Sequence, residues 1–176
     1  MIGYINKRPD TDVMADIRIR KRKRMRAKDV KALSEQLTEV FGTETVTPDD
    51  IVDRAESTDF DVLFVDNDIL GMIHEDKPFL TVRGLLKYRP ETRFVTVDMG
   101  AVPYVTNGAD VMGPGILDAD PAIREGDLVW IRDVKNMVPL AVGISLRDAE
   151  ELKSKGKGKA VTTLHNVGDK LWKSGE

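Results

Sequence analysis

Short runs of strand-forming residues, each closed by turn residues, restrict the fold of this chain more than any other feature. FDVLFV (60–65) and ILGMIH (69–74) are separated by three acidic or amide residues, a pattern typical of a hairpin. DLVWIRD (127–133) and PLAVGISL (139–146) form a second such pair. Further strands are predicted at 94–97 and 160–165. Many short strands with few helices favour a small barrel in the second half of the chain.

Helical periodicity is limited to short segments. Apolar residues recur at helical spacing between residues 30 and 41, and Gly42 stands where a C-terminal cap is expected. Shorter helices are predicted from residue 82 to the break at Pro90, at 100–107, and from residue 148 through 152. Ser145, three residues before Asp148, resembles a capping box that starts the last of these helices.

These patterns predict the α+β class and two domains. A small N-terminal α/β domain with a basic leading segment occupies residues 1–93, and a β-barrel with short helices occupies residues 94–176. Hardly any residues separate Pro90, where the first domain ends its last helix, from Phe94, where the next strand begins. We therefore expect the two domains to be rigidly docked.

The composition excludes several classes of site. The chain has no cysteine, which rules out disulfides, thiolate catalysis and zinc ribbons. Because His74 and His165 are the only histidines, a metal site would rest mainly on carboxylates, and we predict no metal and no cofactor. No apolar run approaches the roughly 20 residues that span a bilayer, and the early segment is polar and basic, unlike a signal peptide. We expect a soluble, cytoplasmic protein without membrane contact.

Charge is distributed unevenly along the chain. Residues 1–31 hold 11 Lys/Arg against 4 Asp/Glu, whereas residues 32–94 hold 6 against 14. Most of the positive charge lies in RIRKRKRMRAK (18–28), the basic run. A solvated strand or arm that aids solubility is its plainer interpretation. Dense basic blocks also bind phosphates, so the run predicts salt-dependent nucleic-acid binding. The candidate contacts are Arg18, Arg20, Lys21, Arg22, Lys23, Arg24, Arg26 and Lys28.

Common catalytic motifs do not occur in the sequence. It has no GxxxxGK[ST], no GxGxxG after a strand, no HExxH and no GxSxG. Asp98 and Asp110 are the candidate acid pair, but Asp98 stands just before Gly100, as a helix N-cap would. We interpret His165 as a structural residue. For Trp130, a core or rim position is the first interpretation and a base-stacking platform is the second. No catalytic residue is predicted.

GADVMGPGI (108–116), the glycine-rich stretch, carries one carboxylate and neither a nucleophile nor a base. Gly108 is expected to end the preceding helix in a left-handed turn. The GPG segment (113–115) is expected to leave main-chain N–H and C=O groups accessible to a ligand. Met112 is expected either to lie against a base or ribose or to fill the end of the barrel. Such a surface is better suited to holding a ligand than to transforming it.

Four blocks of the second half occur in a characteristic order. They are VDMGAVPYVTNGADVMGPGI (97–116), EGDLVWI (125–131), PLAVGISL (139–146) and GKAVTTLHNVGDKLW (158–172). Their order and spacing resemble a PUA domain, the RNA-binding barrel shared by pseudouridine synthases and archaeosine transglycosylases. Ahead of them, residues 61–91 are similar to the N-terminal domain of the malignant T-cell-amplified sequence proteins and their archaeal relatives. Ligatin begins with the same two-domain module.

In PUA domains, RNA lies on the first helix and on the strand and loop that follow it. The resemblance therefore implies RNA binding by Gly100, Ala101, Tyr104, Gly108, Ala109, Asp110, Val111, Met112, Gly113, Pro114 and Gly115. KSKGKGK (153–159), the lysine loop, adds candidate phosphate contacts at Lys153, Lys155, Lys157 and Lys159. A flexible solvated turn is the alternative interpretation of this loop.

The resemblance implies a non-enzymatic RNA-binding protein, a translation initiation or recycling factor that contacts tRNA or rRNA and the small ribosomal subunit. A partner like the density-regulated protein or of the initiation-factor-1 type is expected, because this chain lacks room for the additional domains of ligatin. The alternative is an RNA-targeting accessory subunit of an RNA-modification or ribosome-assembly enzyme. A third class, an enzyme using carboxylates and a divalent ion, would need clustered acids that the second half does not show.

Overall fold

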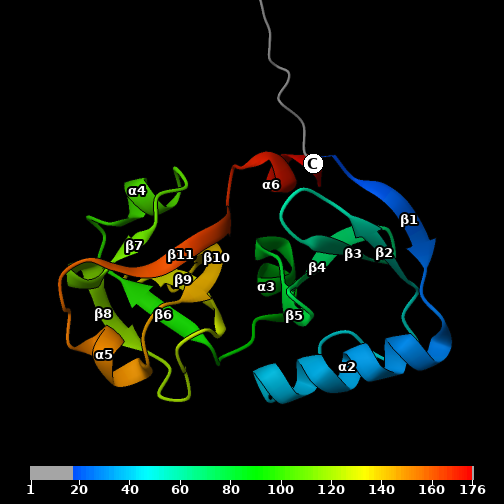
Figure 1. The fold of residues 1–176 in the computed structure, drawn as a ribbon, viewed down its shortest axis with the longest axis horizontal. Helices are drawn as coiled ribbons and strands as arrows, with labels where there is room; N and C mark the ends of the chain where they lie inside the picture. Colours follow the sequence, from blue (N-terminus) through cyan, green and yellow to red (C-terminus); the bar gives the residue numbers. More distant parts are fainter. Residues whose placement is uncertain (1–17, 176) are drawn as a thin grey trace, which may run out of the picture.

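The computed structural model describes residues 18–175, which form two units side by side (Figure 1). The N-terminal unit is a five-stranded antiparallel sheet in the order β1-β2-β3-β4-β5. Helix α2 packs on this sheet, and helix α3 contacts both units. The elements are β1 (Arg20–Arg24), α2 (Ala27–Phe41), β2 (Val52–Glu56), β3 (Asp61–Val65), β4 (Asp68–His74), β5 (Lys77–Leu80) and α3 (Val82–Tyr88).

The C-terminal unit is a six-stranded sheet in the order β7-β11-β10-β9-β6-β8. Strands β6 and β9 are parallel, and the other neighbours are antiparallel. Its elements are β6 (Phe94–Val97), α4 (Val102–Val105), β7 (Val111–Met112), β8 (Ile116–Ala119), β9 (Leu128–Asp133), β10 (Pro139–Ser145), α5 (Ala149–Lys153), β11 (Lys159–Asn166) and α6 (Lys170–Ser174). The predicted α+β class is confirmed. The boundary at 93/94 remains a prediction, and residues 1–17 of the predicted first domain lie outside the described residues.

Local signals explain the elements that were predicted correctly. Helix α2 buries its apolar face and ends at Gly42, whose φ of +70° is the expected left-handed cap. Between β3 and β4, Asp66 and Asn67 both have positive φ, +49° and +76°. This is the conformation that a two-residue hairpin turn requires, and short polar residues tolerate it well.

Four strands were not predicted: β2, β5, β7 and β8. Strand β2 has the sequence VDRAE, in which charged residues obscure the alternation. Strand β5 contains Pro78, which we expected to break the structure, but β5 is the last strand of its sheet. A proline is tolerated on such an edge because no ladder hydrogen bond is needed there. Strands β7 and β8 flank a 3-10 turn, Gly113–Gly115, in a stretch where the residue pattern alone indicated no strand.

The predicted capping box of Ser145 and Asp148 is wrong. Asp148 is itself the N-cap of α5, and its partner is Glu151, three residues later. Ser145 is the last residue of β10, and its hydroxyl donates to the carbonyl of Arg147 at 2.6 Å. A carboxylate accepts the first helical N–H groups as well as a hydroxyl does. The capping box therefore consists of Asp148 and Glu151 and begins three residues later than predicted.

The two units share an interface with a continuous apolar core. Trp130 and Val142 of the second sheet join the cluster that is built mainly from the first sheet and α2. The guanidinium of Arg83 on α3 donates to the carbonyl of Trp172 at 2.9 and 3.3 Å and lies over the Trp172 ring at 4.0 Å. These contacts show that the two halves pack against each other, and the rigidity of this docking stays a prediction.

His165 completes this interface as a buried hydrogen-bonding residue. Its Nε2 accepts the N–H of Val82 at 3.2 Å, and its Nδ1 lies 2.8 Å from Oδ2 of Asp169. Because Nε2 is an acceptor, the tautomer that fits carries its proton on Nδ1 and donates it to Asp169. His165 is 1% exposed, which confirms its structural interpretation.

The carboxylate of Asp169 makes the interface sensitive to acid. Burial opposes its charge, but hydrogen bonds from His165 and from the N–H groups of Trp172 and Asn166 hold the pKa of Asp169 below its ordinary value. A folded pKa below the unfolded one stabilises the protein above the unfolded pKa, near 4, and this contribution is lost as pH falls through the folded pKa.

We expect the wild type to lose more unfolding free energy than Asp169→Asn as pH is lowered from about 5 to about 2, because only the wild type has this carboxylate to protonate. Urea unfolding at a series of pH values measures the difference. Parallel pH profiles for the two proteins would contradict the role of Asp169.

Candidate nucleic-acid interface

The predicted RNA-binding helix is short and is fixed by its neighbours. Oδ1 of Asp98 accepts the N–H of Ala101 at 2.9 Å, which closes the turn before α4; the N-cap residue of α4 is Ala101, so the predicted N-cap role of Asp98 is wrong. Only Val102–Val105 is helical, not the whole of 100–107, and Gly108 follows with a φ of +91°. Tyr104 on this helix is 69% exposed, the largest value among the exposed apolar and aromatic side chains.

The eleven predicted cleft residues differ in exposure. Gly100, Tyr104, Gly108, Ala109, Met112 and Pro114 are exposed, and Ala101, Asp110 and Gly115 are half-buried, whereas Val111 and Gly113 are buried. Met112 is 50% exposed, so it does not fill the end of the barrel. Met99, 43% exposed and next to Gly100, also belongs to this surface, and the sequence did not single it out.

Most main-chain groups of the GPG segment are engaged, contrary to expectation. The N–H of Gly113 donates to the carbonyl of Gly158 at 2.8 Å, and the carbonyl of Gly115 accepts the N–H of Asp98 at 3.0 Å. The carbonyl of Gly113 accepts the N–H of Ile116. These groups hold the turn in place. The candidate contacts on this surface are therefore chiefly its exposed side chains.

The lysine loop lies against the glycine-rich stretch. Met112 pairs with Lys159 across β7 and β11, and Nζ of Lys159 lies 3.1 Å from Oδ2 of Asp110. Partial burial disfavours the charge of Asp110, but the N–H of Thr163 and the Lys159 ammonium hold its pKa below the ordinary value. Lys159 is thus paired. Among residues 18–175, the exposed lysines Lys153, Lys155 and Lys157 have no ion-pair partner.

The basic run forms the exposed edge strand β1 and enters α2 at Ala27. Nε of Arg22 and Nε of Arg24 bind the two carboxylate oxygens of Asp53 at 2.7 and 2.6 Å. Hydrogen bonds from Arg24 and Arg22 hold the pKa of Asp53 below its ordinary value. Lys21 lies 3.8 Å from Glu56, and Arg26 lies 3.2 Å from Asp29.

Part of the run is therefore neutralised within the protein. Arg20 and Lys23 lie on the same strand and have no ion pair in the described part of the chain. Both side chains are exposed.

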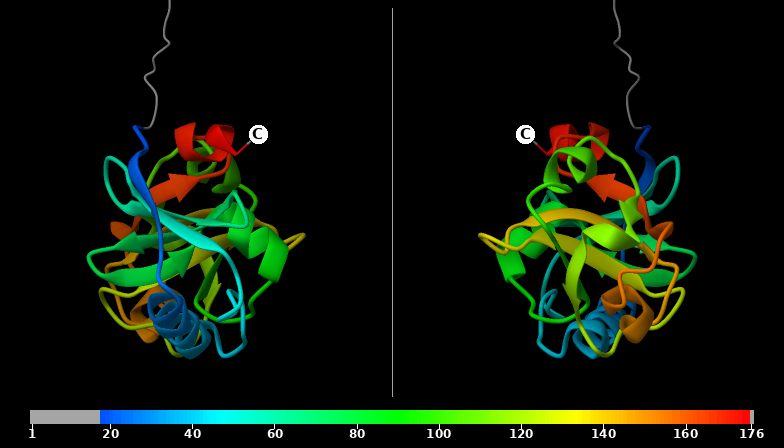
Figure 2. Two further views of the ribbon diagram at one scale, coloured as in Figure 1. Left: turned by 90° about the vertical axis from the view of Figure 1, so that its right-hand side faces the viewer. Right: turned by 90° about the vertical axis from the view of Figure 1, so that its left-hand side faces the viewer.

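The two candidate surfaces lie at opposite ends of the molecule. In Figure 1, β1 is at the right-hand edge, whereas α4, β7 and the end of β11 near the lysine loop are at the left-hand edge. The end-on views of Figure 2 agree, because β1 is at the front in one view and the C-terminal unit is at the front in the other. The structure thus unites the glycine-rich stretch with the lysine loop and separates both from the basic run.

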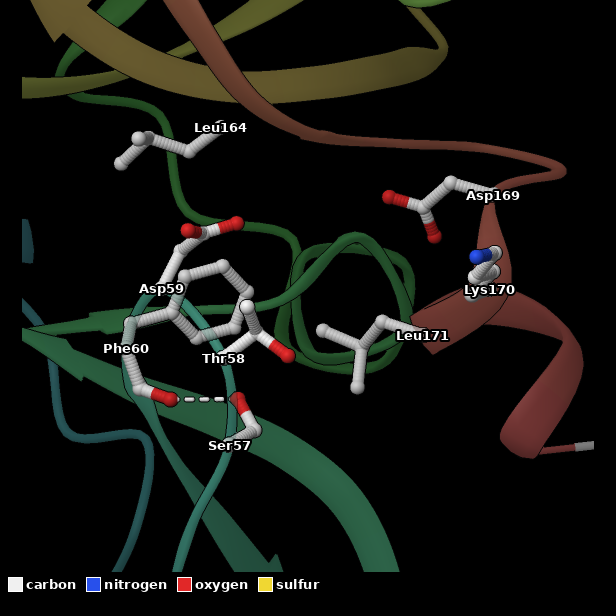
Figure 3. Close-up of a pocket in the computed structure, with 8 residues that line it drawn as sticks. All are labelled: Ser57, Thr58, Asp59, Phe60, Leu164, Asp169, Lys170 and Leu171. Atoms are coloured by element: carbon white, nitrogen blue, oxygen red, sulfur yellow. Dashed lines mark hydrogen bonds between the residues drawn. The ribbon is translucent and has the colours of Figure 1, made fainter. Parts of the chain in front are cut away.

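A pocket of about 270 Å³ lies between the two units (Figure 3). It is lined by Ser57, Thr58, Asp59, Phe60, Leu164, Asp169, Lys170 and Leu171. The carboxylate of Asp169 is engaged by His165, Asn166 and Trp172. No group of three or more residues in 18–175 has the arrangement of metal ligands, and no helix in that range is long and apolar enough to cross a membrane.

Trp130 is a core residue, as its first interpretation predicted. It is 4% exposed, and its Nε1–H donates to the carbonyl of Thr92 at 2.6 Å. A nucleic-acid base cannot stack on the Trp130 ring, because the residue is almost fully buried.

Comparison with known proteins places these features in a family. The PUA domain family matches residues 93–167. An uncharacterized protein of Methanocaldococcus jannaschii is 41% identical over 156 residues, which cover 88% of this chain and 96% of that protein. The crystal structure of a hypothetical protein from Pyrococcus horikoshii superposes with a TM-score of 0.79 at 37% identity, over 88% of this chain and 99% of the other.

Two eukaryotic relatives have informative names. Translation machinery-associated protein 20 of Saccharomyces cerevisiae is 31% identical over 114 residues, 61% of this chain and 63% of the yeast protein. The malignant T-cell-amplified sequence 1 homolog of Drosophila melanogaster is 34% identical over 105 residues, 57% of this chain and 58% of the fly protein. The chain thus matches less than two thirds of the length of each of these two relatives.

Proposed function

This chain belongs to the PUA-domain family that contains the malignant T-cell-amplified sequence proteins and their archaeal relatives, and we propose that it is a non-enzymatic, cytoplasmic RNA-binding factor of translation. The name of the yeast relative supports a role in translation. The observation that carries the proposal is the surface of α4 and β7, where Tyr104 and Met112 are exposed and Met112 pairs with Lys159 of the lysine loop.

We propose transfer RNA, near its acceptor end, as the ligand of this surface. An unpaired RNA end exposes base faces that can stack on an aromatic ring such as that of Tyr104. Lysines without an ion pair, such as Lys155 and Lys157, neutralise phosphates of the same strand. Tyr104 would then contact a base, and the lysines would position the phosphate backbone of the RNA.

The basic strand β1 is proposed to bind ribosomal RNA of the small subunit. Its exposed cations, Arg20 and Lys23 in particular, favour phosphates without regard to sequence. The shared apolar core of the two units supports simultaneous contact with two RNA elements, because the two surfaces lie at opposite ends of units that pack together (Figure 1).

A partner protein like the density-regulated protein, or of the initiation-factor-1 type, is proposed on the family resemblance. Affinity purification of the tagged chain from its own cells tests this proposal. We expect small-subunit particles together with an initiation-factor-like protein. Recovery with an RNA-modification enzyme or with large-subunit precursors would instead support the accessory-subunit alternative.

Charge reversal on β1 should weaken RNA binding. In Arg20→Glu with Lys23→Glu, two candidate phosphate contacts are lost, so the slope of log affinity against log salt should become shallower by about 2. Filter binding of ribosomal RNA over a range of salt concentrations measures the slope. Lys87→Glu with Lys135→Glu makes the same charge change at exposed positions outside both surfaces. Equal slopes in the two double variants would show that β1 does not contact the RNA.

The bound RNA can be identified by crosslinking in cells, followed by sequencing of the RNA recovered with the protein. We expect transfer RNA and small-subunit ribosomal RNA. Recovery of neither would contradict the proposed function.

A further inference from the structure

Arg147 holds the lysine loop in place through hydrogen bonds to the main chain of the loop. It follows β10, and the hydroxyl of the fully buried Ser145 donates to its main-chain carbonyl at 2.6 Å. Its guanidinium reaches into the loop, where Nη1 donates to the carbonyl of Gly156 at 2.8 Å and Nη2 to the carbonyl of Lys157 at 2.7 Å. A guanidinium presents donors in a rigid planar fork, which suits two neighbouring acceptors.

The glycine-rich stretch holds the next carbonyl of the same loop. The N–H of Gly113 donates to the carbonyl of Gly158 at 2.8 Å. Three successive loop carbonyls are thus engaged by Arg147 and Gly113. The amide N–H groups of the same three residues have no acceptor among residues 18–175. Carbonyl oxygens repel phosphate and amide hydrogens attract it, so this arrangement favours an anion at the loop.

We propose that Arg147 is a positioning residue that fixes the lysine loop as a phosphate-binding element beside the α4 and β7 surface. This inference rests on the proposed function, because the phosphates in question belong to the RNA backbone. Arg147 acts through the loop: its bonds to the carbonyls of Gly156 and Lys157 hold the segment that carries Lys155 and Lys157 against Gly113. A glycine-punctuated loop without this support would have to be ordered on binding, which weakens affinity.

A double-mutant cycle tests the inference. The full chain binds an unmodified tRNA transcript in four forms: wild type, Arg147→Ala, Lys155→Ala with Lys157→Ala, and the triple variant. If Arg147 acts through these lysines, Arg147→Ala should weaken binding about tenfold in the wild type but less than about twofold when the lysines are already absent. Equal losses in both backgrounds would overturn the inference.

Arg147→Lys separates positioning from direct charge. Lysine keeps the positive charge but cannot bind both carbonyls with a planar fork, so we expect it to bind RNA as weakly as Arg147→Ala. Recovery of wild-type affinity would overturn the inference, because Arg147 would then act as a simple cation. Thermal unfolding checks that each variant is folded, and Arg147→Lys replaces Arg147→Ala in the cycle if the latter is not.

The binding measurements distinguish a failure of the role of Arg147 from a failure of the proposed function. If the wild type does not bind the transcript, the proposed function fails, and the role of Arg147 in RNA binding fails with it. If the wild type binds and the cycle is additive, only the role of Arg147 fails.

Discussion

Gly113→Ala is expected to lower the unfolding free energy by about 2 kcal/mol and RNA affinity at least about tenfold. A Cβ on Gly113 would lie 1.7 Å from the carbonyl oxygen of Gly156 and 2.6 Å from Nη1 of Arg147. Main-chain atoms of the lysine loop would have to move, and the hydrogen bond from Gly113 to Gly158 would be strained. Urea unfolding and binding of a tRNA transcript measure the two effects.

Gly115→Ala is the matched control for stability. Its Cβ would meet only the Cβ of Ala101 at 3.4 Å, an ordinary contact, so we expect its unfolding free energy to change by less than about 0.5 kcal/mol. At Gly113, by contrast, any side chain would meet the carbonyl of Gly156, so no larger residue leaves the lysine loop in its present place. A stable Gly113→Ala protein would show that the lysine loop is not packed against this glycine.

His165→Leu is expected to lower the unfolding free energy by about 3 kcal/mol. Leucine fills a similar volume but leaves the N–H of Val82 without an acceptor, and a buried unsatisfied group costs about 1–3 kcal/mol. The charged Asp169 also loses its hydrogen bond from Nδ1, which adds to the loss. Both effects fall on the interface between the units, so chemical denaturation measures them directly.

His74→Leu is the control for this change. His74 is the other histidine of the chain and lies half-buried at the end of β4. Its replacement should change the unfolding free energy by less than about 0.5 kcal/mol. Equal stability of the two variants would contradict the hydrogen-bonded role of His165.

The sequence predicted the features that depend on neighbours along the chain. Gly42 ends α2, and Asp66 and Asn67 form the turn of the β3–β4 hairpin, because both signals act within a few residues. Asp98 also makes a local hydrogen bond, but in the turn before α4 and not at the N-cap where the sequence placed it. The family resemblance added the expectation that α4 and the glycine-rich stretch bind RNA, which stays a prediction.

The sequence could not predict contacts between distant segments. Asp53 neutralises Arg22 and Arg24 only because β2 pairs with β1, about thirty residues away along the chain. Gly113 is buried because the lysine loop folds over it, although the glycine pattern alone indicated open backbone. Arg147 gave no signal, because a single arginine before a helix is compatible with many roles.

RNA is proposed to bind on the α4 and β7 surface beside the lysine loop. Ultraviolet crosslinking of the purified full chain to a tRNA transcript, with mass-spectrometric mapping of the modified peptides, tests it most directly. We predict crosslinks between residues 99 and 115, at Tyr104 or Met112, and these should disappear when excess unlabelled transcript competes. Crosslinks confined to α2 or to the pocket of Figure 3, with residues 99–115 unmodified, would contradict the claim.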